Sequence, residues 1–474
     1  MRISSNRLLA VIAGLATAVA ATRAAQNRPA PAAARTPTFA ADIAPIVYAN
    51  CVTCHRPGQA APFSLLTYED VRKHGEDIAD VTSSRYMPPW HASKAEGFPE
   101  FQDERHLSDE AIATFQRWVD AGMPSGDLKR APSPPVFPSG WTLGPPDLVL
   151  PIARPIEVPA EGPDIYRNVS LAIDLPEDRW ITAIDYKPSA RRVVHHALYF
   201  TGPSDVPVAD DEAVPGLAGL ARLRALIAAR QGAPPPPPSS GGEVAAAADA
   251  WGGLGGWVPG VTPRFFPDGI AQPLPKHTNL IAQLHLHPTG KVESEHGQLA
   301  VYFAKTPPKR SLTGVQVPPA FGIGMGIDIP ANEAHYVIRD SYVLPVDVDA
   351  YGARGHAHYL GKEMRMTATL PDGTTRGVLL IKDWDFSWQD SYYFKTPFKL
   401  PKGTKLDTEI VYDNSVDNSR NPNYPPQRVR WGRESFDEMG SMTLLVTTDD
   451  AAGAQALRLG QSQHLREQLL RRPR

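Results

Sequence analysis

The placement of its two cysteines constrains this chain more than any other feature. Both lie within five residues, in Cys51-Val52-Thr53-Cys54-His55, and the rest of the chain contains none. Disulfides between distant segments therefore cannot form, and the chain must fold by packing alone. At 474 residues it is too long for one hydrophobic core, so we expect roughly two to four domains.

The spacing Cys-x-x-Cys-His is the attachment signature of a c-type haem. The two thiols add to the porphyrin vinyl groups, and the adjacent histidine reaches the iron from the same turn. A zinc knuckle is one alternative, but zinc prefers four ligands and no third cysteine exists. A thiol redox pair is the other. We expect one covalent haem c, held by Cys51, Cys54 and His55.

The N-terminus has the pattern of an export signal. Arg2 and Arg7 precede an apolar stretch at 8–21, and small residues follow it, which predicts a signal peptide over 1–25. A membrane anchor is the alternative, but the stretch is short and alanine-rich for a span. We expect a periplasmic or secreted protein with no stable membrane span after cleavage. A net charge of -3 gives no electrostatic case for a nucleic-acid partner.

Helical patterning follows a linker at 26–37 and fills a domain at 38–128. Ser108 is a good N-cap, and the apolar residues after it, including Phe115 and Trp118, share one helix face. A proline-rich linker at 129–149 ends this region. We therefore predict a small all-α domain around the haem motif.

From residue 150 the pattern changes to short apolar or alternating runs separated by turn residues. These runs predict strands at 168–175, 180–186, 193–201, 279–286, 298–304, 363–370, 377–384, 405–412 and 442–447. The pattern is typical of antiparallel β-sandwiches. We expect two in tandem, at 150–305 and 306–450, with a surface insert at 215–250. The basic tail at 451–474 is interpreted as a frayed, solvated end, with a short amphipathic helix as the alternative.

Histidines cluster in the β region, as His195-His196, His285 with His287, and His356 with His358. Residues i and i+2 of a strand share a face, so His356 and His358 can bind one ion. Adjacent His195 and His196 would point to opposite faces, and binding one ion requires a bend or bulge there. We expect His277, His296 and His335 not to be ligands.

Imidazole alone does not select a metal, because zinc, copper, iron and nickel all accept it. A thioether does select, since soft sulfur favours copper and above all Cu(I). Met439, in Asp437-Glu438-Met439 near the last strand, provides such a ligand.

Four motifs together resemble the copper type II, ascorbate-dependent monooxygenases, the family of peptidylglycine α-hydroxylating monooxygenase and dopamine β-monooxygenase. They are the His-His pair, Gln283-Leu284-His285, the His-x-His before Leu360-Gly361-Lys362, and Asp-Glu-Met, in matching order over roughly residues 150 to 450. The resemblance implies two tandem jelly-roll-like β-sandwich domains with one copper each. It assigns His195, His196 and His285 to an electron-relaying copper, and His356, His358 and Met439 to a dioxygen-activating copper.

Resemblance to monohaem cytochromes c favours Met87, in Met87-Pro88-Pro89-Trp90, as the sixth haem ligand. Met123 is the competitor, and His74, His91 and His106 are interpreted as surface histidines. A His/Met pair would raise the reduction potential and suit electron transfer.

The combined resemblances imply an exported monooxygenase that hydroxylates a C–H bond with O₂, in which the haem relays single electrons to two coppers. Its substrate would be a small or peptide-like molecule, and its external electron donor ascorbate, a quinol-linked protein or a cytochrome. Arg354 lies where peptide-acting members hold a substrate carboxylate, but Ser441 and Thr443 replace other peptide-seating residues. The alternatives are a periplasmic electron-transfer or copper-binding protein without monooxygenase activity, and a haem sensor.

Overall fold

The computed structural model describes residues 35–59, 61–137, 140–162, 164–173, 175–203, 254–267, 269–432 and 435–471. The predicted signal peptide, most of the 26–37 linker and the 215–250 insert lie outside the described residues. The described chain is mostly antiparallel β-sheet with few helices. None of its helices combines the length and apolar character needed to cross a membrane.

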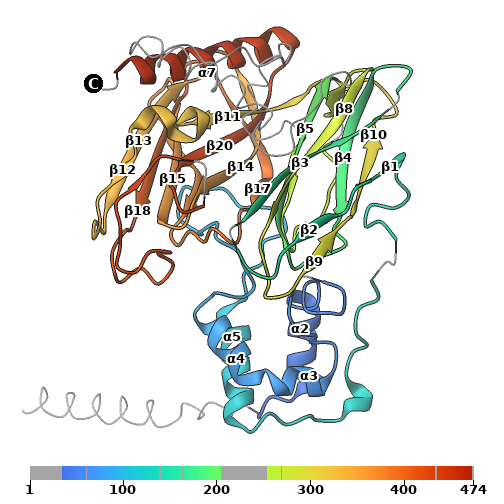
Figure 1. Cartoon of the computed structure of the whole chain (residues 1–474). Coiled ribbons are helices and arrows are strands. Elements are labelled where there is room, and N and C mark those ends of the chain that lie inside the picture. Colours follow the sequence, from blue (N-terminus) through green and yellow to red (C-terminus); the bar gives the residue numbers. More distant parts are fainter. Residues whose placement is uncertain are drawn as a thin grey trace, which may run out of the picture.

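The described part of the chain before residue 131 forms a helical unit, drawn below the two β units in Figure 1. Its elements are η1 (Phe39–Ile43), α2 (Ala44–Asn50), α3 (Tyr68–Lys73), α4 (Gly75–Ser83), α5 (Asp109–Asp120) and η2 (Leu128–Arg130). Ser108 caps α5 by accepting the N–H of Ala111, as predicted. Phe115 and Trp118 are fully buried in a small core shared by these helices.

The first β unit contains two four-stranded sheets around one core. One sheet has the order β1-β10-β4-β7 and the other β3-β8-β5-β6, with a short β2-β9 ribbon beside them. The strands are β1 (Leu148–Pro151), β2 (Ile156–Val158), β3 (Ile165–Leu171), β4 (Arg179–Lys187), β5 (Val194–Pro203), β6 (Gly256–Trp257), β7 (Gln272–Leu274), β8 (Thr278–Leu286), β9 (Glu293–Glu295) and β10 (Gln298–Phe303). Buried aliphatic residues from both sheets form the core between them.

The second β unit repeats this plan with sheets β11-β20-β14-β17 and β13-β18-β15-β16 and a short β12-β19 ribbon. The strands are β11 (Leu312–Val317), β12 (Asp328–Ile329), β13 (Tyr336–Val343), β14 (Val348–Ala357), β15 (Gly361–Thr369), β16 (Thr375–Ile381), β17 (Ser391–Leu400), β18 (Lys405–Tyr412), β19 (Val429–Arg430) and β20 (Gly440–Thr447), with η3 (Pro319–Met325) between β11 and β12. Its core also joins both sheets.

The C-terminal tail is not a frayed end, so that interpretation was wrong. Residues Ala451–Arg471 form helix α7, which lies against the second β unit (Figure 1). Leu457 is 1% exposed in that unit's core, and His464 bonds to Asp340 of β13 at 2.8 Å. Leu465 and Leu469 of the same helix pack against Ala320 and Ile323 of η3.

An extended segment between α4 and α5, at 88–107, leaves the helical unit and docks on the second β unit. Ala92 forms an antiparallel bridge with Ile381, and Phe101 forms one with Phe394. Both side chains are almost fully buried in the core of the second β unit. Because that core includes side chains from the helical region, the two parts are packed together and not merely tethered.

Candidate functional site

Three of the sequence-predicted ligands converge where β5 begins and β8 ends. The Nδ1 atoms lie 3.2 Å apart between His195 and His196, 3.1 Å between His195 and His285, and 3.3 Å between His196 and His285. The pairing of β5 with β8 shifts register between Val194 and His196. This irregularity supplies the bulge that the sequence analysis required, because it turns two adjacent side chains toward one point.

The triangle of nitrogens has the dimensions of a metal site. Imidazole–metal bonds of about 2.0–2.1 Å at tetrahedral angles place ligand nitrogens about 3.3–3.4 Å apart. Without an ion the arrangement is frustrated, because each Nδ1 is either a donor or an acceptor and at least two of the three must share a role. A bound cation removes the conflict, since all three can then present lone pairs. Among the described residues, this trio is the group of His, Cys, Asp or Glu side chains that could hold an ion.

Asp164, which lies just before β3, orients one of these imidazoles. Its carboxylate accepts a hydrogen bond from His285 Nε2 at 2.7 Å and from His287 Nδ1 at 2.7 Å. Since Nε2 carries the proton, His285 presents the lone pair of Nδ1 to the centre of the trio. Burial raises the pKa of Asp164, but the hydrogen bonds from His285 and His287 outweigh it, so the pKa is well below its usual range.

Burial keeps two histidines of the trio, His195 and His196, neutral near pH 7. Burial lowers the pKa of His195 to about 3, with a further contribution from His285. His196 is 9% exposed, and burial lowers its pKa well below the ordinary value. Neutral imidazole is the form that binds metal ions. The trio therefore has the geometry of a metal site, and His195 and His196 have the protonation state that such a site needs.

The second predicted ligand set gathers at the end of β14. The rings of His356 and His358 have centroids 5.3 Å apart, and both side chains are buried. His356 Nδ1 donates to Gln389 Oε1 at 2.6 Å, and His358 Nδ1 donates to the carbonyl of Asp437 at 3.0 Å. In the neutral form, both imidazoles would therefore carry their lone pair on Nε2, unlike that of His285, which would carry it on Nδ1.

Glu438 brings Met439 to the same place. Its Oε1 accepts the N–H of His358 at 2.6 Å and the N–H of Met439 at 2.9 Å. Its Oε2 accepts the N–H of Leu360 at 3.0 Å. Burial raises the pKa of Glu438 to about 8, while these N–H groups lower it. One fully buried carboxyl group thus fixes two of the three predicted ligands side by side.

Phe386, from the loop between β16 and β17, lies between the two ligand sets. Its ring centroid is 5.1 Å from that of His195 and 5.4 Å from that of His358. The two separations add to 10.5 Å, which is the greatest distance at which those two imidazoles can lie. Phe386 is 4% exposed, so a buried aromatic ring contacts both sets.

A cavity of about 170 Å³ is lined by His196 of the first set, by Gln389, which bonds to His356 of the second, and by all three parts of the chain. His196 and Trp257 line it from the first β unit, and Gln389 and Arg354 from the second. Trp90, of the docked segment, adds an aromatic wall. Arg354 lies two residues before His356 on β14, so the two share a face of the sheet.

The predicted haem-attachment residues follow α2 directly. The N–H of His55 donates to the carbonyl of Cys51 at 3.0 Å, so the thiols and the imidazole lie in one turn. Both thiols are free, and burial raises the pKa of Cys51 to about 12. Two thiols three residues apart with an adjacent histidine fit the chemistry of haem attachment, and the His55 ring packs on Phe63 with centroids 4.7 Å apart.

The two methionines weighed as sixth ligand lie in different surroundings. Met87 follows α4, and its N–H donates to the carbonyl of Val81 at 3.0 Å. Met123 lies with its sulfur beside Gly75 and packs against the helical core. The described contacts of Met87 do not include His55, so its role stays a prediction.

Sequence reasoning missed the residues that orient the ligands. Asp164, Gln389 and Phe386 come from loops with no metal-binding motif. The acidic residue before Met439 was noticed only as part of a motif, and its carboxyl group turned out to bind both neighbouring ligands. His287 shares Asp164 with His285, which gives it a supporting role beside that ligand.

Comparison with known proteins identifies no family. No family model matches the chain, and no curated protein matches it. Among solved structures, the major capsid protein P2 of bacteriophage PM2 matches with 9% identity, 63% of this chain, 96% of that chain and a TM-score of 0.24. The VP2 subviral particle of infectious bursal disease virus matches with 12% identity, 62% and 58% coverage and a TM-score of 0.19. TM-scores this low support no conclusion about fold or function.

Proposed function

We propose that this chain is an exported haem- and copper-containing monooxygenase that hydroxylates a C–H bond with O₂. One copper would be held by His195, His196 and His285, and the other by the second ligand set. When bound, the coppers supply one-electron transfer and dioxygen chemistry, and a c-type haem supplies single electrons. The observation that carries the proposal is the triangle of three Nδ1 atoms 3.1 to 3.3 Å apart.

The residues around the ligands would perform distinct tasks. Asp164 would fix the tautomer of His285, and Glu438 would hold His358 and Met439 together. A substrate would enter the cavity beside His196, where the resemblance implies that Arg354 binds a carboxylate.

The position of Cys54 supports electron entry through the three-histidine set. A Cβ built on Gly260 would lie 3.1 Å from Cys54 Sγ, so the attachment site abuts the loop after β6. Trp257 of β6 pairs with Ala197 of β5, the residue after His196. The chain therefore provides a short route of bonded and packed atoms from the thiol to that set.

Phe386 favours the alternative of an electron-transfer or copper-binding protein without monooxygenase activity, because its ring packs against a histidine of each set. Product analysis separates the two functions. A hydroxylated product supports the monooxygenase, whereas redox cycling without product supports the alternative. A Phe386→Ala variant tests the ring itself, since more product in the variant than in the wild type would identify it as an obstacle.

Metal analysis of exported protein is the primary test. One haem motif and two ligand sets predict about one iron and two coppers per chain. A single copper that disappears in a His195→Ala variant would contradict the second set. Met439→Ala should abolish turnover while the three-histidine site keeps its copper. Two fully occupied coppers in that variant would show that Met439 is not a ligand.

Stopped-flow mixing of reduced protein with dioxygen tests the electron relay. The haem band should reoxidise more slowly after copper removal and in a His356→Ala, His358→Ala protein. Reoxidation at an unchanged rate in both would overturn the relay, even if the copper content agrees with the proposal.

A further inference from the structure

Arg105, in the segment that links α4 to α5, contacts all three parts of the chain. Its Nε donates to the carbonyl of Pro89 at 3.1 Å, at the start of the docked segment that follows α4. Its Nη1 donates to the carbonyl of Gly260 in the first β unit at 3.4 Å. Its Nη2 pairs with Asp390 Oδ2 in the second β unit at 2.6 Å. The guanidinium fork uses each of its nitrogens on a different part of the fold.

The loop that receives Arg105 also supports the second ligand set. Asp390 is the neighbour of Gln389, whose Oε1 accepts the Nδ1–H of His356 at 2.6 Å. Six residues earlier in this loop, Trp384 donates its Nε1–H to the carbonyl of His358 at 3.1 Å. Residues 382–390 therefore bond to both histidines of the set, and Arg105 holds their far end.

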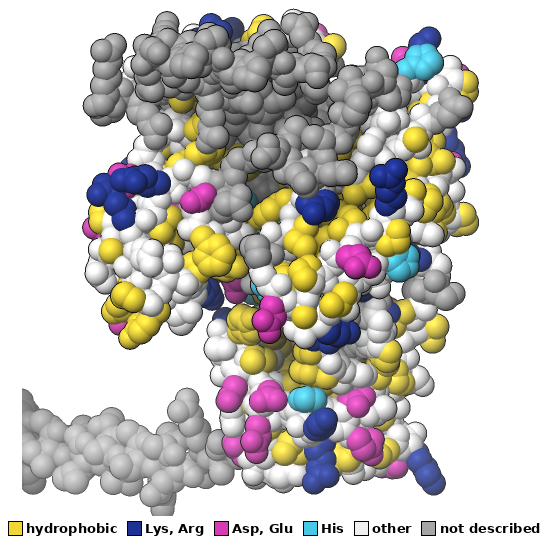
Figure 2. Space-filling view, in the orientation of Figure 1, with side chains coloured by type: hydrophobic (Ala, Val, Ile, Leu, Met, Phe, Trp, Pro, Cys, Tyr) yellow, Lys and Arg dark blue, Asp and Glu magenta, His cyan; other side chains and the backbone are white. Residues whose placement is uncertain are grey.

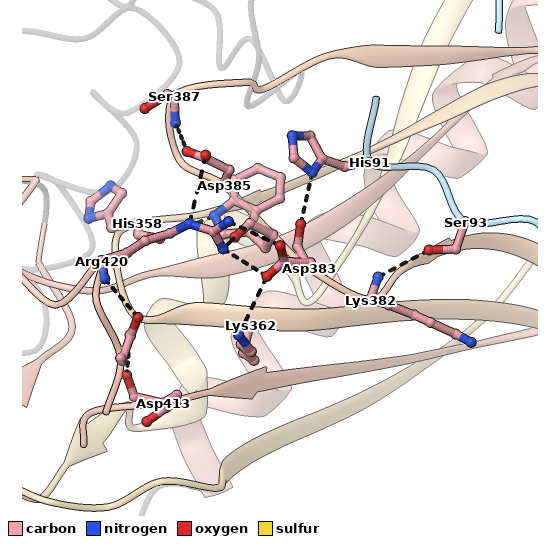
Figure 3. A network of polar contacts seen from close by, with 12 residues as sticks. His91, Ser93, His358, Lys362, Lys382, Asp383, Asp385, Ser387, Asp413 and Arg420 are labelled. Carbon is pink, nitrogen blue, oxygen red and sulfur yellow. Dashed lines mark hydrogen bonds and ion pairs between the residues drawn. The ribbon is translucent and has the colours of Figure 1, made fainter. Parts of the chain in front are cut away.

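The docked segment fixes the near end of the same loop. Figure 3 shows His91 pointing at Asp383, whose carbonyl bonds to its Nδ1 at 2.8 Å, while Arg420 pairs with the Asp383 carboxylate. Ser93 donates its N–H to the carbonyl of Leu380 at 2.7 Å. The loop is thus held at both ends by residues of the region that carries the haem motif.

We propose that Arg105 is a positioning residue for the His356/His358/Met439 set. Its ion pair with Asp390 is only 14–31% exposed on its two side chains, so solvent screens it less than a surface pair. The ion pair holds Asp390 in place and thereby fixes the position of the adjacent Gln389. Gln389 in turn orients the ring of His356 through its hydrogen bond. The region carrying the haem motif would thereby build part of the copper site directly. This inference rests on the proposed function only in naming the metal as copper.

Partners that orient metal-binding histidines change metal affinity by about 10–100-fold when they are removed. Arg105 contacts Asp390, and only the next residue, Gln389, contacts His356. We therefore expect Arg105→Gln to weaken copper binding at the second set by about tenfold, the lower limit of that range. Arg264→Gln is the matched control, because Arg264 joins Asp103 at 2.6 Å and also spans two parts of the chain. Arg264 makes no described hydrogen bond to residues 382–390.

The experiment measures copper affinity by chelator competition in the full-length haem-loaded protein, in a His195→Ala background that leaves the second set. Arg105→Gln should weaken copper about tenfold and alter its electron paramagnetic resonance spectrum, and Arg264→Gln should do neither. Adding Asp390→Asn to Arg105→Gln should cost little more, because the two act through one contact. Equal effects of the two arginine variants, or no effect of Arg105→Gln, would overturn the proposal.

Amide hydrogen exchange of the metal-free protein provides a readout that does not depend on copper. Arg105→Gln should speed exchange in residues 382–390 and Arg264→Gln should not. If the wild type binds no copper at the second set, the proposed function fails, yet faster exchange in the variant still supports the positioning role. Unchanged exchange in Arg105→Gln contradicts the role whether or not copper binds.

Discussion

Replacement of Asp164 tests how the three-histidine set is organised. In Asp164→Asn the amide keeps one acceptor oxygen for three donors, which are His285 Nε2, His287 Nδ1 and Ser435 Oγ at 3.1 Å. At least one donor therefore loses its partner, and the negative charge is lost. Because His285 is 1% exposed, solvent cannot replace the carboxylate as its hydrogen-bond partner. The His287 side chain is 60% exposed and can hydrogen-bond to solvent instead.

The size of the effect follows from the role of the carboxylate. Loss of such a partner weakens metal binding by about 10–100-fold, or about 1.4–2.7 kcal/mol. We expect Asp164→Asn near the lower limit, because its oxygen can still accept from His285. Asp164→Ala should lie near the upper limit, because it also leaves a buried N–H unpaired at a cost of about 1–3 kcal/mol.

Copper titration against a chelator, with a Met439→Ala background that isolates the three-histidine site, measures these affinities. His287→Ala is the control, because it removes a partner of Asp164 without removing the bond to His285. We expect at most a roughly fivefold effect there, since an exposed polar contact of this kind contributes about 0–1 kcal/mol. Equal losses in His287→Ala and Asp164→Asn, or no loss in Asp164→Ala, would refute the reasoning.

Two further predictions concern stability. Removing copper with a chelator should lower the melting temperature by calorimetry, because an ion at 100 times its Kd stabilises by about 2.7 kcal/mol; an unchanged transition would argue against buried metal. Glu438→Ala leaves three buried N–H groups unpaired at about 1–3 kcal/mol each and should abolish copper binding at the second set. Glu295→Ala is the control, because it removes an equally buried carboxyl group from the first β unit. It should destabilise the protein without loss of copper from the second set. Equal second-set affinities in these two variants would contradict a specific role for Glu438.

The regular strands could be predicted from sequence wherever alternation was strong. Each of the nine predicted strand ranges overlaps a strand of the structure, and the pairs are antiparallel. Strand β14 was missed, although it carries His356, because Gly352 and Gly355 interrupt its apolar pattern. Glycine lowers strand propensity, yet here a Cβ at Gly355 would collide with Met364. The close packing of the two sheets thus favours glycine at this position, and the same glycine interrupts the pattern by which the strand would be predicted.

Spacing along the chain predicted part of the metal-ligand geometry. The His-x-His pair and the need for a bulge at His195-His196 follow from the two-residue period of a strand. The partners of those histidines did not follow, because Asp164 and Gln389 lie about 121 and 33 residues from the ligands that they contact. Only the packing of sheets and loops brings such residues together, and no local pattern records it.

The docked segment changes what the linker after the helical unit is expected to do. A flexible tether sets the effective concentration of a donor, which falls as about the −3/2 power of linker length. Here Ala92 and Phe101 are buried in the second β unit, so contact is set by packing. Doubling the 129–149 linker with Gly-Ser residues after the exposed Ser133 should therefore leave stopped-flow haem reoxidation unchanged.

A tethered arrangement gives a different result in the same experiment. The effective concentration would fall about threefold on doubling the linker, and reoxidation would slow in proportion. A Phe101→Ala variant provides the complementary perturbation, because loss of a buried phenylalanine costs about 3–5 kcal/mol and weakens the docking itself. If doubling the linker slows reoxidation in the wild type, the packed arrangement is refuted. If doubling the linker slows reoxidation only in Phe101→Ala, buried contacts, and not the linker, hold the two parts together.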